Sequence, residues 1–368
     1  MIITKLHIRN FRNYQNVDLS FDSGVQMILG KNAQGKTNLL EAILYLSTTR
    51  SHRSNDDRDL IRYGEELFII EGEVARSRQK IKLKAIGESG KKHLMIYQET
   101  VAKVSQFIGE CNVILFCPDD LMLFQAAPKV RRRFIDMELS KMSKVYTQTL
   151  LQANKLLKER NQFLKQNQTD DIFLGVLDEQ LAEKEVTIME QRKAFLAKLI
   201  EFAQPFYREL SDDDTMLSCA YHTFVSECDK ESRKQAILEK RKKCRERDYM
   251  LKQTTIGCHK DDVTFYLNDH PIEEYASQGQ KRCVLLAMKI GLVHMIYELT
   301  KEYPILLLDD VFSELDQERR KRLLKALPKE VQIFISATDL DVIDLEGRSF
   351  QVWKVHNGTI HKLKGGIS

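Results

Sequence analysis

The sequence lacks several features that would at once assign it to a large class of proteins. It has 368 residues, and no apolar run approaches the roughly 20 residues that a membrane-spanning helix needs. Residues 1–8 alternate in polarity like a strand and lack the apolar core of a signal peptide. These absences predict a protein of the cytoplasm that has no membrane partner.

Paired cysteines are also missing. The seven cysteines are scattered along the chain, and no two of them form a C-x-x-C motif. Neither a disulfide framework nor a zinc site has its spacing here. Cys111, Cys219 and Cys283 stand among apolar residues, so we expect them to be small hydrophobic residues of the core.

A strong excess of one charge is missing too, since the formal net charge is only +4. With 43% hydrophobic and 30% charged residues, the chain has the composition of a folded globular protein. It is long enough for a large core and for two lobes. Dense clusters of Lys and Arg occur at residues 131–133, 240–247 and 319–322. Each alone is most often a solvated helix face, but together they indicate phosphate binding.

Apolar periodicity predicts strands toward both ends of the chain and helices in the middle. The expected strands are 1–8, 17–21, 25–29, 67–74, 80–86, 113–116, 216–225, 263–267, 305–308 and 333–335. The expected helices are 36–46, 134–163, 176–202, 229–251 and 283–299, with turns or breaks at 88–90, 167–171 and 211–214. The pattern predicts one α/β domain built from both ends of the chain, with a mostly helical lobe inserted in it.

One segment matches a complete phosphate-binding motif. Gly30-Lys31-Asn32-Ala33-Gln34-Gly35-Lys36-Thr37 fits G-x-x-x-x-G-K-[ST] between an apolar strand and an apolar helix. The two glycines permit a tight turn that directs backbone N–H groups at phosphate oxygens, and the helix N-terminus adds partial positive charge. We expect Lys36 to neutralise the β- and γ-phosphates of a nucleotide and Thr37 to place its hydroxyl on Mg²⁺.

A second motif ends a strand that is predicted to be buried. The run Ile305-Leu306-Leu307-Leu308 precedes Asp309 and Asp310, at the strand end where ligands of parallel sheets usually bind. We expect Asp309 to hold Mg²⁺ through water, and Asp310 to point to the other side and accept a proton from the attacking water. Lys36, Asp309 and Asp310 are therefore the predicted catalytic residues, and Thr37 and Asp309 the predicted metal residues. The two motifs alone fit kinases, GTPases and many ATPases.

Two further motifs narrow the choice. Ser277-Gln278-Gly279-Gln280 precedes an apolar helix, and Ser313-Glu314-Leu315-Asp316 follows the two aspartates. The order of the four motifs resembles that of the ABC-type ATPases. In that superfamily the serine and glycine of S-x-G-Q contact the γ-phosphate bound by the opposite subunit. The resemblance implies that Ser277, Gly279 and Gln280 form a second anion site, which a hydroxyl, a glycine and a helix N-terminus suit chemically.

Within that superfamily the sequence resembles the RecF family over nearly its whole length. The segments that carry the resemblance are 11–14, 37–43, 50–53, 116–121, 128–136, 257–262 and 308–316. The resemblance implies an α/β fold, an ABC-type P-loop ATPase head. Residues 1–125 would be the N-terminal part of lobe I, 126–252 the helical lobe II, and 253–368 the signature motif and the rest of lobe I. It also implies that Arg12 and Asn38 belong to the nucleotide site.

The resemblance implies a function as well. RecF-like proteins bind ATP, dimerise head to head and load on duplex DNA near gaps or single-strand junctions. They work with RecO and RecR to help RecA replace single-strand-binding protein, and they are linked to replication restart and SOS induction. The cofactors would be ATP and Mg²⁺, and the enzyme would be a slow, DNA-stimulated ATPase in which ATP is a dimerisation switch. Our expected DNA surface is Lys240, Arg241, Lys242, Lys243, Arg245 and Arg247.

The chain departs from these patterns at a few positions. Cys258 and Lys260 stand where the family usually has Pro and Arg. Transporter-type ABC proteins carry a switch histidine after the last core strand, whereas Ile335-Ser336-Ala337-Thr338 has none. Thr338 is then left to sense the γ-phosphate by a weaker hydroxyl contact, and we expect slow hydrolysis.

Three alternative functions compete with this interpretation. A metabolic P-loop kinase would use Arg50 and Arg53 on a lid, but S-x-G-Q and S-x-L-D have no role in such an enzyme. An ATP-binding subunit of a transporter would need a surface for a membrane partner. A chromosome-organising or double-strand-break repair ATPase would need long coiled coils or a C-x-x-C hook, and the sequence has neither.

Overall fold

The computed structural model describes residues 1–54, 56–88, 90–166, 170–211, 214–226, 229–338 and 345–367. The chain divides into two compact units. The first unit comprises residues 1–121, 201–215 and 277–368, and the second unit comprises 122–200 and 216–276. The lobe limits expected from the sequence, after residues 125 and 252, differ from this division.

Two elements explain the difference in limits. Helix α5 (Asp171–Ser211) enters the first unit at residue 201, where its last turns pack on α8 (Gln278–Thr300). There the ring of Phe206 stacks on His294 with 5.0 Å between centroids. Residues 253–276 stay in the second unit because strand β10 (Asp262–Leu267) pairs with β9 (Leu217–His222). Sequence periodicity carries no information about either long-range contact.

The first unit contains an antiparallel sheet of six strands with the order β2-β1-β4-β5-β6-β7. Its strands are β1 (Ile2–Phe11), β2 (Tyr14–Ser20), β4 (Leu67–Ala75), β5 (Lys80–Glu88), β6 (Lys91–Ile96) and β7 (Glu99–Thr100). Side chains alternate between a buried apolar face and a charged face, as expected for a sheet that faces water on one side. On the charged face, Lys84 Nζ lies 2.7 Å from Glu71 Oε1 on the neighbouring strand.

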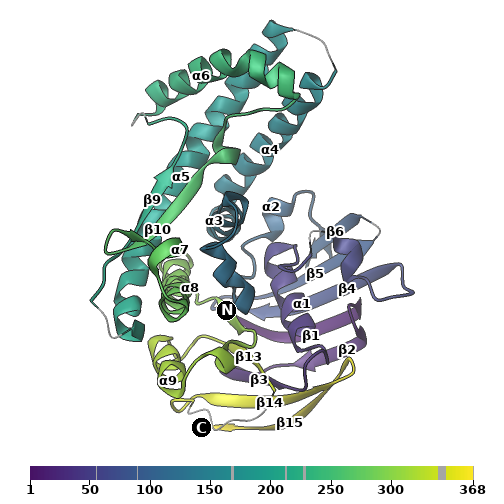
Figure 1. Ribbon diagram of the computed structural model, residues 1–368. Helices are drawn as coiled ribbons and strands as arrows, with labels where there is room; N and C mark the ends of the chain where they lie inside the picture. The colour runs from purple at the N-terminus through teal and green to yellow at the C-terminus, as the bar shows by residue number, and fades with distance from the viewer. Residues whose placement is uncertain are drawn as a thin grey trace. The chain divides into compact units, whose positions relative to one another are not determined.

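A second six-stranded sheet of the same unit has the order β15-β14-β3-β13-β12-β8. Its strands are β3 (Val25–Leu29), β8 (Val113–Phe116), β12 (Ile305–Leu308), β13 (Ile333–Ala337), β14 (Ser349–His356) and β15 (Thr359–Ile367). All are parallel except β15, and the short inner strands are buried on both faces, which explains their continuous apolar runs. In this sheet β3 and β8, from the first third of the chain, lie next to β12, β13 and β14 from its last third. The predicted α/β fold, built from both ends of the chain, is confirmed (Figure 1).

Helix α1 (Lys36–Thr48) contacts strands of both sheets and is buried on nearly all sides (Figure 1). That environment explains why residues 39–46 of the helix are apolar apart from Glu41. The other helical segments assigned to this unit are α2 (Val104–Phe107), α8, α9 (Gln317–Ala326), η1 (Asp57–Leu60) and η4 (Val311–Glu314). Among the described residues, α8 alone is long and apolar enough to cross a membrane, but 72% of its most apolar window is buried inside the fold.

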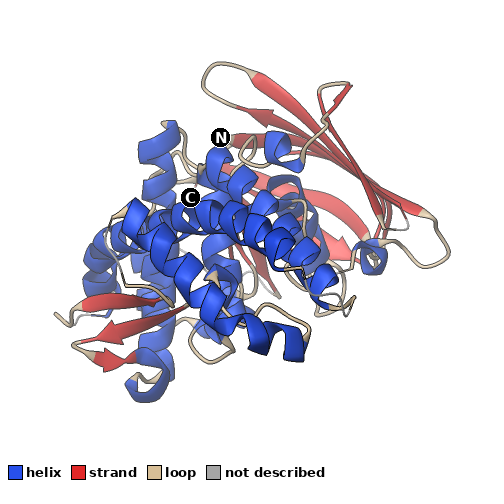
Figure 2. Ribbon diagram, turned by 90° about the horizontal axis from the view of Figure 1, so that it is seen from above, coloured by secondary structure: helices blue, strands red, loops and turns tan. Residues whose placement is uncertain are grey.

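The second unit is mostly helical, as predicted. Its helices are α3 (Pro128–Met142), α4 (Lys144–Leu164), α5, α6 (Lys230–Leu251), α7 (Ile272–Tyr275) and η3 (Cys258–Lys260), and η2 (Pro118–Leu123) precedes them. A three-stranded antiparallel sheet of β9, β10 and β11 (His270–Pro271) accompanies them (Figure 2).

The single helix expected at 134–163 is two helices in the structure. Ser143 ends α3, and its side chain accepts a hydrogen bond from Tyr146 N to cap α4. Asp170 caps α5 in the same way, through Ile172 N and Phe173 N. The expected turns or breaks at 88–90, 167–171 and 211–214 fall partly outside the described residues.

Charged side chains form a buried network in the second unit. Arg160 is fully buried on α4, donates to Asp178 Oδ1 at 2.8 Å, and lies 2.8 Å from Asp248 Oδ2. Arg241 is also fully buried and donates to Glu185 Oε2 at 2.7 Å. Removing one partner of such a pair leaves an uncompensated charge in a low-dielectric interior, which costs far more than the pair contributes.

We predict that Arg160→Met destabilises the second unit by about 3–5 kcal/mol, because Asp178 and Asp248 lose their shared cation. Thermal and urea unfolding followed by circular dichroism would measure the change. The control is Glu159→Ala on the exposed side of the same helix, which should unfold like the wild type. Equal stability of Arg160→Met and the wild type would contradict a structural role for the network.

Candidate nucleotide-binding site

The predicted phosphate loop lies between β3 and α1, as its motif requires. Gly35 has φ of 121°, and a Cβ there would lie 2.6 Å from Asn13 Nδ2, so only glycine fits. Lys36 Nζ donates to Gly30 O at 2.7 Å and lies 3.3 Å from Lys31 O. The ammonium group is therefore held inside the curve of the loop, where phosphate oxygens would replace these carbonyl partners.

Two turns from opposite ends of the chain hold the loop in shape. Asn13 Nδ2 donates to Gln34 O at 2.8 Å, and Tyr14 Oη donates to Gly35 O at 2.9 Å. From the hairpin between β14 and β15, Gly358 N donates to Gln34 O at 3.2 Å and Asn357 N donates to Gln34 Oε1 at 2.8 Å. The sequence reasoning missed the hairpin, since no motif marks residues whose role is to support another loop.

The second predicted motif meets the loop at the carboxyl end of β12. Thr37 Oγ1 donates to Asp309 Oδ1 at 3.1 Å across 272 residues of sequence. Ser336 Oγ, at the end of β13, donates to the same oxygen at 2.7 Å and accepts from Asp310 N at 2.8 Å. Sequence reasoning missed Ser336, although a serine inside the apolar run of β13 is a usable signal.

The two aspartates do not diverge as the sequence reasoning expected. Asp310 has a left-handed backbone, with φ of 52°, and its Oδ1 lies 3.3 Å from the Ser336 hydroxyl that also bonds Asp309. The expectation that Asp310 points to the other side is therefore wrong for this structure, because one hydroxyl group reaches both carboxylates. Ser313 Oγ donates to Asp310 O at 2.6 Å and stabilises the turn.

Burial raises the pKa of Asp309 above its ordinary value, although hydrogen bonds from Ser336 and Thr37 act in the opposite direction. Asp309 therefore takes up a proton at a higher pH than an exposed aspartate would. Its ionised form calls for a nearby cation, and the hydroxyl and carboxylate oxygens at this point are the donor types that Mg²⁺ prefers. No group of three or more His, Cys, Asp or Glu side chains suited to a metal occurs among the described residues, so phosphate and water would have to supply further ligands.

Asn38 lies in the first turn of α1, beside the phosphate loop. Arg12 follows β1 and contacts Glu41, which lies further along α1. Asn38 Nδ2 donates to Asn13 Oδ1 at 2.8 Å, so it contacts the residue that supports Gln34. Arg12 makes two hydrogen bonds of 2.9 Å to the carboxylate of Glu41, which is fully buried. Burial would raise the pKa of Glu41, but the hydrogen bonds from Arg12 and Ser51 outweigh it and hold the pKa below its ordinary value.

His52 is a further polar residue near these carboxylates. Its Nδ1 is buried and, within the described part of the chain, has no hydrogen-bond partner. Burial lowers the pKa of the ring, against the effect of Glu41 and Asp309. The neutral ring adds no charge to the site. In the sequence, His52 was noted only as part of the segment Arg50-Ser51-His52-Arg53, which contributes to the family resemblance.

The predicted signature motif caps α8 and is open to solvent. Ser277 Oγ accepts from Gln280 N at 3.2 Å, and Gln280 Oε1 accepts from Ser277 N at 2.9 Å, which is a capping box. A Cβ on Gly279 would meet only Ser277 Oγ, at 3.9 Å. None of the described hydrogen bonds joins these residues to residues 30–37 of the same chain. The start of α8 is thus exposed at Ser277, and its described hydrogen bonds are those of the capping box.

The predicted DNA-binding cluster on α6 is only partly exposed. Arg241 is fully buried and pairs with Glu185, and Arg245 pairs with Asp178 at 3.1 Å. The prediction that Arg241 lies on a DNA surface is therefore wrong, because its guanidinium group is buried and paired with Glu185. Arg245 is half-buried and is paired with Asp178. Lys240, Lys242, Lys243 and Arg247 are exposed.

The basic clusters at 131–133 and 319–322 also contain arginines that pair with acceptor groups of their own unit. In the second unit, Arg131 donates to both carboxylate oxygens of Asp262, at 2.7 and 2.8 Å. In the first unit, Arg319 Nη1 lies 3.0 Å from Asp316 Oδ2, and Arg322 Nη1 donates to Glu209 O at 3.0 Å. A dense run of basic residues in the sequence is therefore a poor guide to free positive charge in this protein.

Comparisons with known proteins agree with this geometry. The family described as AAA domain matches residues 5–255. "DNA replication and repair protein RecF" of Ligilactobacillus salivarius is 39% identical over 369 residues, covering 98% of this chain and 97% of the relative. The protein of the same name from Geobacillus thermodenitrificans is 40% identical over 370 residues, covering 98% and 99%.

Solved structures give the same result. A structure described as the recombination mediator protein RecF-ATP in the RecFOR pathway has a TM-score of 0.91 and 32% identity, covering 98% of this chain and 97% of that one. Its RecF-ATPrS counterpart has a TM-score of 0.90, with coverage of 99% and 98%. An Smc head bound to the C-winged helix domain of ScpA, with a TM-score of 0.57 and 15% identity over 100% and 98% of the chains, shares the fold alone.

We predict that Ser336→Ala weakens Mg²⁺-dependent nucleotide binding by roughly 10-fold, because Asp309 loses the hydroxyl that orients it. Isothermal titration with a magnesium–nucleotide complex would measure the affinity. Ser20→Ala is the matched comparison, since Ser20 is exposed at the end of β2 and has no described contact with either aspartate. Equal losses for the two variants would contradict the importance of the Ser336 contacts.

Proposed function

The chain belongs to the AAA-domain family and to the RecF family of DNA replication and repair proteins, and from this membership we propose that it is an ATP-dependent DNA-binding protein of recombinational repair. ATP would bind at residues 30–37 and join two copies into a dimer. The dimer would bind duplex DNA near single-strand gaps and act with RecO and RecR in loading the recombinase. The curated relatives and the RecF-ATP structure, all similar to this chain over nearly full length, support the proposal.

One observation supports the nucleotide switch most directly. The proposed site has two parts, and no hydrogen bond or ion pair among the described residues joins them within one chain. The phosphate loop, Thr37 and Asp309 form one part, and the solvent-exposed N-terminus of α8 at Ser277 forms the other. A helix N-terminus with free N–H groups attracts negative charge. A triphosphate held by the first part of one copy would complete its contacts with the second part of another copy.

Each residue of the site has a defined role in this proposal. Lys36 and the loop N–H groups would bind the β- and γ-phosphates in place of the carbonyl groups that Lys36 now contacts. Thr37 and Asp309 would hold Mg²⁺, which supplies neutralisation of phosphate charge when bound. Ser336 would orient Asp309, and Asp310 would accept a proton from water. Arg12 would act indirectly, by fixing Glu41 in α1.

Slow turnover fits the same geometry. The end of β13 presents Ser336 to the carboxylates, and no histidine precedes Thr338 on that strand. A serine hydroxyl carries no charge to stabilise a developing phosphate anion. We therefore propose that ATP serves mainly as the link between two copies and that hydrolysis ends the association. DNA stimulation and the cytoplasmic location remain predictions from the sequence.

The exposed face of α6 is the best remaining part of the predicted DNA surface. Lys240, Lys243 and Arg247 are spaced three and four residues apart, which places them on one side of the helix. Lys240 Nζ also donates to Phe224 O. The exposed cations of this stripe would contact phosphates, while Arg241 and Arg245 hold the helix in place from its inner side.

The alternative functions gain no support from the structure or the relatives. A kinase would leave the exposed S-x-G-Q turn at the start of α8 without a role. A transporter subunit would leave unexplained the similarity to proteins named for DNA replication and repair.

We predict that Ser277→Arg keeps nucleotide affinity and loses the ATP-dependent dimer, because a long cation at the start of α8 blocks the approach of a second copy. Analytical ultracentrifugation with and without a non-hydrolysable ATP analogue and Mg²⁺ would show the change. Ser20→Arg, at an exposed position on β2, is the charge-matched control and should dimerise normally. Lys36→Ala should fail at the earlier step of nucleotide binding. A normal ATP-dependent dimer of Ser277→Arg would refute the two-sided site.

We predict that duplex affinity falls as the salt concentration rises, since Lys and Arg contacts to phosphate release counterions. Lys243→Ala with Arg247→Ala should reduce the slope of log affinity against log salt by roughly two. Fluorescence anisotropy with a labelled duplex would measure the slope, and Lys91→Ala with Lys193→Ala, at exposed sites elsewhere, removes the same charge. An unchanged slope in the α6 variant would exclude this helix from the DNA surface.

A further inference from the structure

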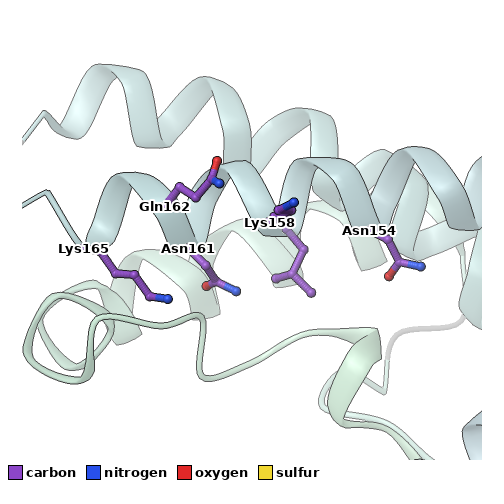
Figure 3. Close-up of a pocket in the computed structure, with 6 residues that line it drawn as sticks. Asn154, Lys158, Asn161, Gln162 and Lys165 are labelled. Carbon is purple, nitrogen blue, oxygen red and sulfur yellow. The ribbon is translucent and has the colours of Figure 1, made fainter. Parts of the chain in front are cut away.

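Helix α4 carries a polar groove that none of the motifs marks. The groove has a volume of about 360 Å³. It is lined by Asn154, Leu157, Lys158, Asn161 and Gln162 of α4 and by Lys165, the C-cap residue of that helix (Figure 3). In Figure 3 the side chains of Asn154, Asn161 and Lys165 point from α4 to the same side, along more than two turns of the helix.

The lining carries positive charge with no compensating carboxylate. It contains two ammonium groups, three amides and no carboxylate. Lys158 and Lys165 are exposed, and no ion pair is described for either of them. Arg160 on the same helix is turned inward and neutralised by Asp178, so the positive charge at the groove comes from the two lysines.

Contacts behind the groove fix its shape. Thr254 N and Thr254 Oγ1 donate to Asn161 Oδ1 at 2.7 and 2.8 Å, which fastens the segment after α6 to α4. Because these bonds occupy the carbonyl oxygen of the Asn161 amide, its nitrogen is the atom presented to an occupant. Thr254 Oγ1 in turn accepts from the buried Arg160 Nη1 at 2.9 Å. The groove is thus built on the same network that stabilises the second unit.

We propose that this groove binds the sugar–phosphate backbone of nucleic acid. Lys, Asn and Gln side chains are among the groups that make most protein contacts to phosphate oxygens. Lys158 and Lys165 are separated by about 10 Å along the helix axis, at 1.5 Å per residue. Phosphates of one strand recur every 3.4 Å along the duplex axis, so two ammonium groups at this separation can contact different phosphates of one bound backbone. The inference rests on the proposed DNA binding of this chain and adds a contact surface to it.

An acidic polypeptide is the main competing occupant, and the lining argues against it. Protein partners usually anchor through apolar or aromatic side chains buried in a pocket. Leu157 is the only apolar residue among the six that line the groove. A groove of amides and ammonium groups instead suits a hydrated, regularly charged ligand. Lys158 and Lys165 escaped the sequence reasoning because they are seven residues apart, outside any dense basic cluster.

The test compares full-length variants by fluorescence anisotropy with a labelled DNA duplex over a range of salt. Lys158→Ala with Lys165→Ala is expected to weaken binding at least several-fold and to lower the salt slope by roughly two. Lys158→Arg with Lys165→Arg should restore both values, and Lys158→Glu with Lys165→Glu should weaken binding further. Lys91→Ala with Lys193→Ala is the charge-matched control and should bind like the wild type.

The outcomes separate this inference from the proposed function. If the wild type binds duplex and the alanine pair binds it with equal affinity and slope, the groove is not a nucleic-acid site, although the proposed function stands. If the wild type itself does not bind duplex, the proposed function fails first. If polyglutamate binds the wild type more tightly than duplex at equal charge, and the alanine pair loses that binding, the groove takes acidic polypeptide and our inference is wrong. Unchanged circular dichroism of the variants shows that folding is intact.

Discussion

A single buried carboxylate, that of Asp309, connects three segments that are far apart in the sequence. It accepts hydrogen bonds from Thr37 after the phosphate loop and from Ser336 at the end of β13, while β12 delivers it from below. Burial makes its charge costly, the two hydroxyl groups offset part of that cost, and a nearby cation would offset more of it. The strands β3, β13 and β12 are parallel neighbours, so the segments at their carboxyl ends meet. This arrangement brings together Thr37 Oγ1, Ser336 Oγ and Asp309 Oδ1.

The sequence was sufficient for the inner strands and for the positions of the predicted phosphate loop and aspartate motif at the ends of those strands. Residues 25–29, 113–116 and 305–308 are strands at the limits expected, because burial on both faces leaves an unmistakable apolar run. Other residues could not be predicted in this way. Asn357 and the break at Ser143 depend on contacts made only in the folded chain, whereas Ser336 was missed although it is a serine inside an apolar run. No pattern of spacing could show that Arg241 faces Glu185, since both are charged and both suit a solvated helix.

Positive charge in this protein has two separate uses. In the second unit, Arg160, Arg192 and Arg241 are buried with carboxylates and determine how the helices pack. Lys158, Lys165, Lys243 and Arg247 remain at the surface of the same helices. Arginine suits the first use because its planar fork makes two directed hydrogen bonds, and lysine suits the second because it is a flexible, well-hydrated point charge. The division explains why counting basic residues along the sequence overestimates the surface available to an anionic partner.

The support of Gln34 by Asn357 and Gly358 has a consequence for biosynthesis. The phosphate loop is translated before the hairpin that supports it, since Asn357 follows Gln34 by 323 residues. A Cβ at Gly358 would lie 2.3 Å from Asn13 O, so the hairpin must also fit closely against the first turn. A nascent chain therefore contains the whole phosphate-loop motif before the residues that hold this loop in shape have been made. The loop should therefore reach its final shape only after residues 357 and 358 have joined the fold.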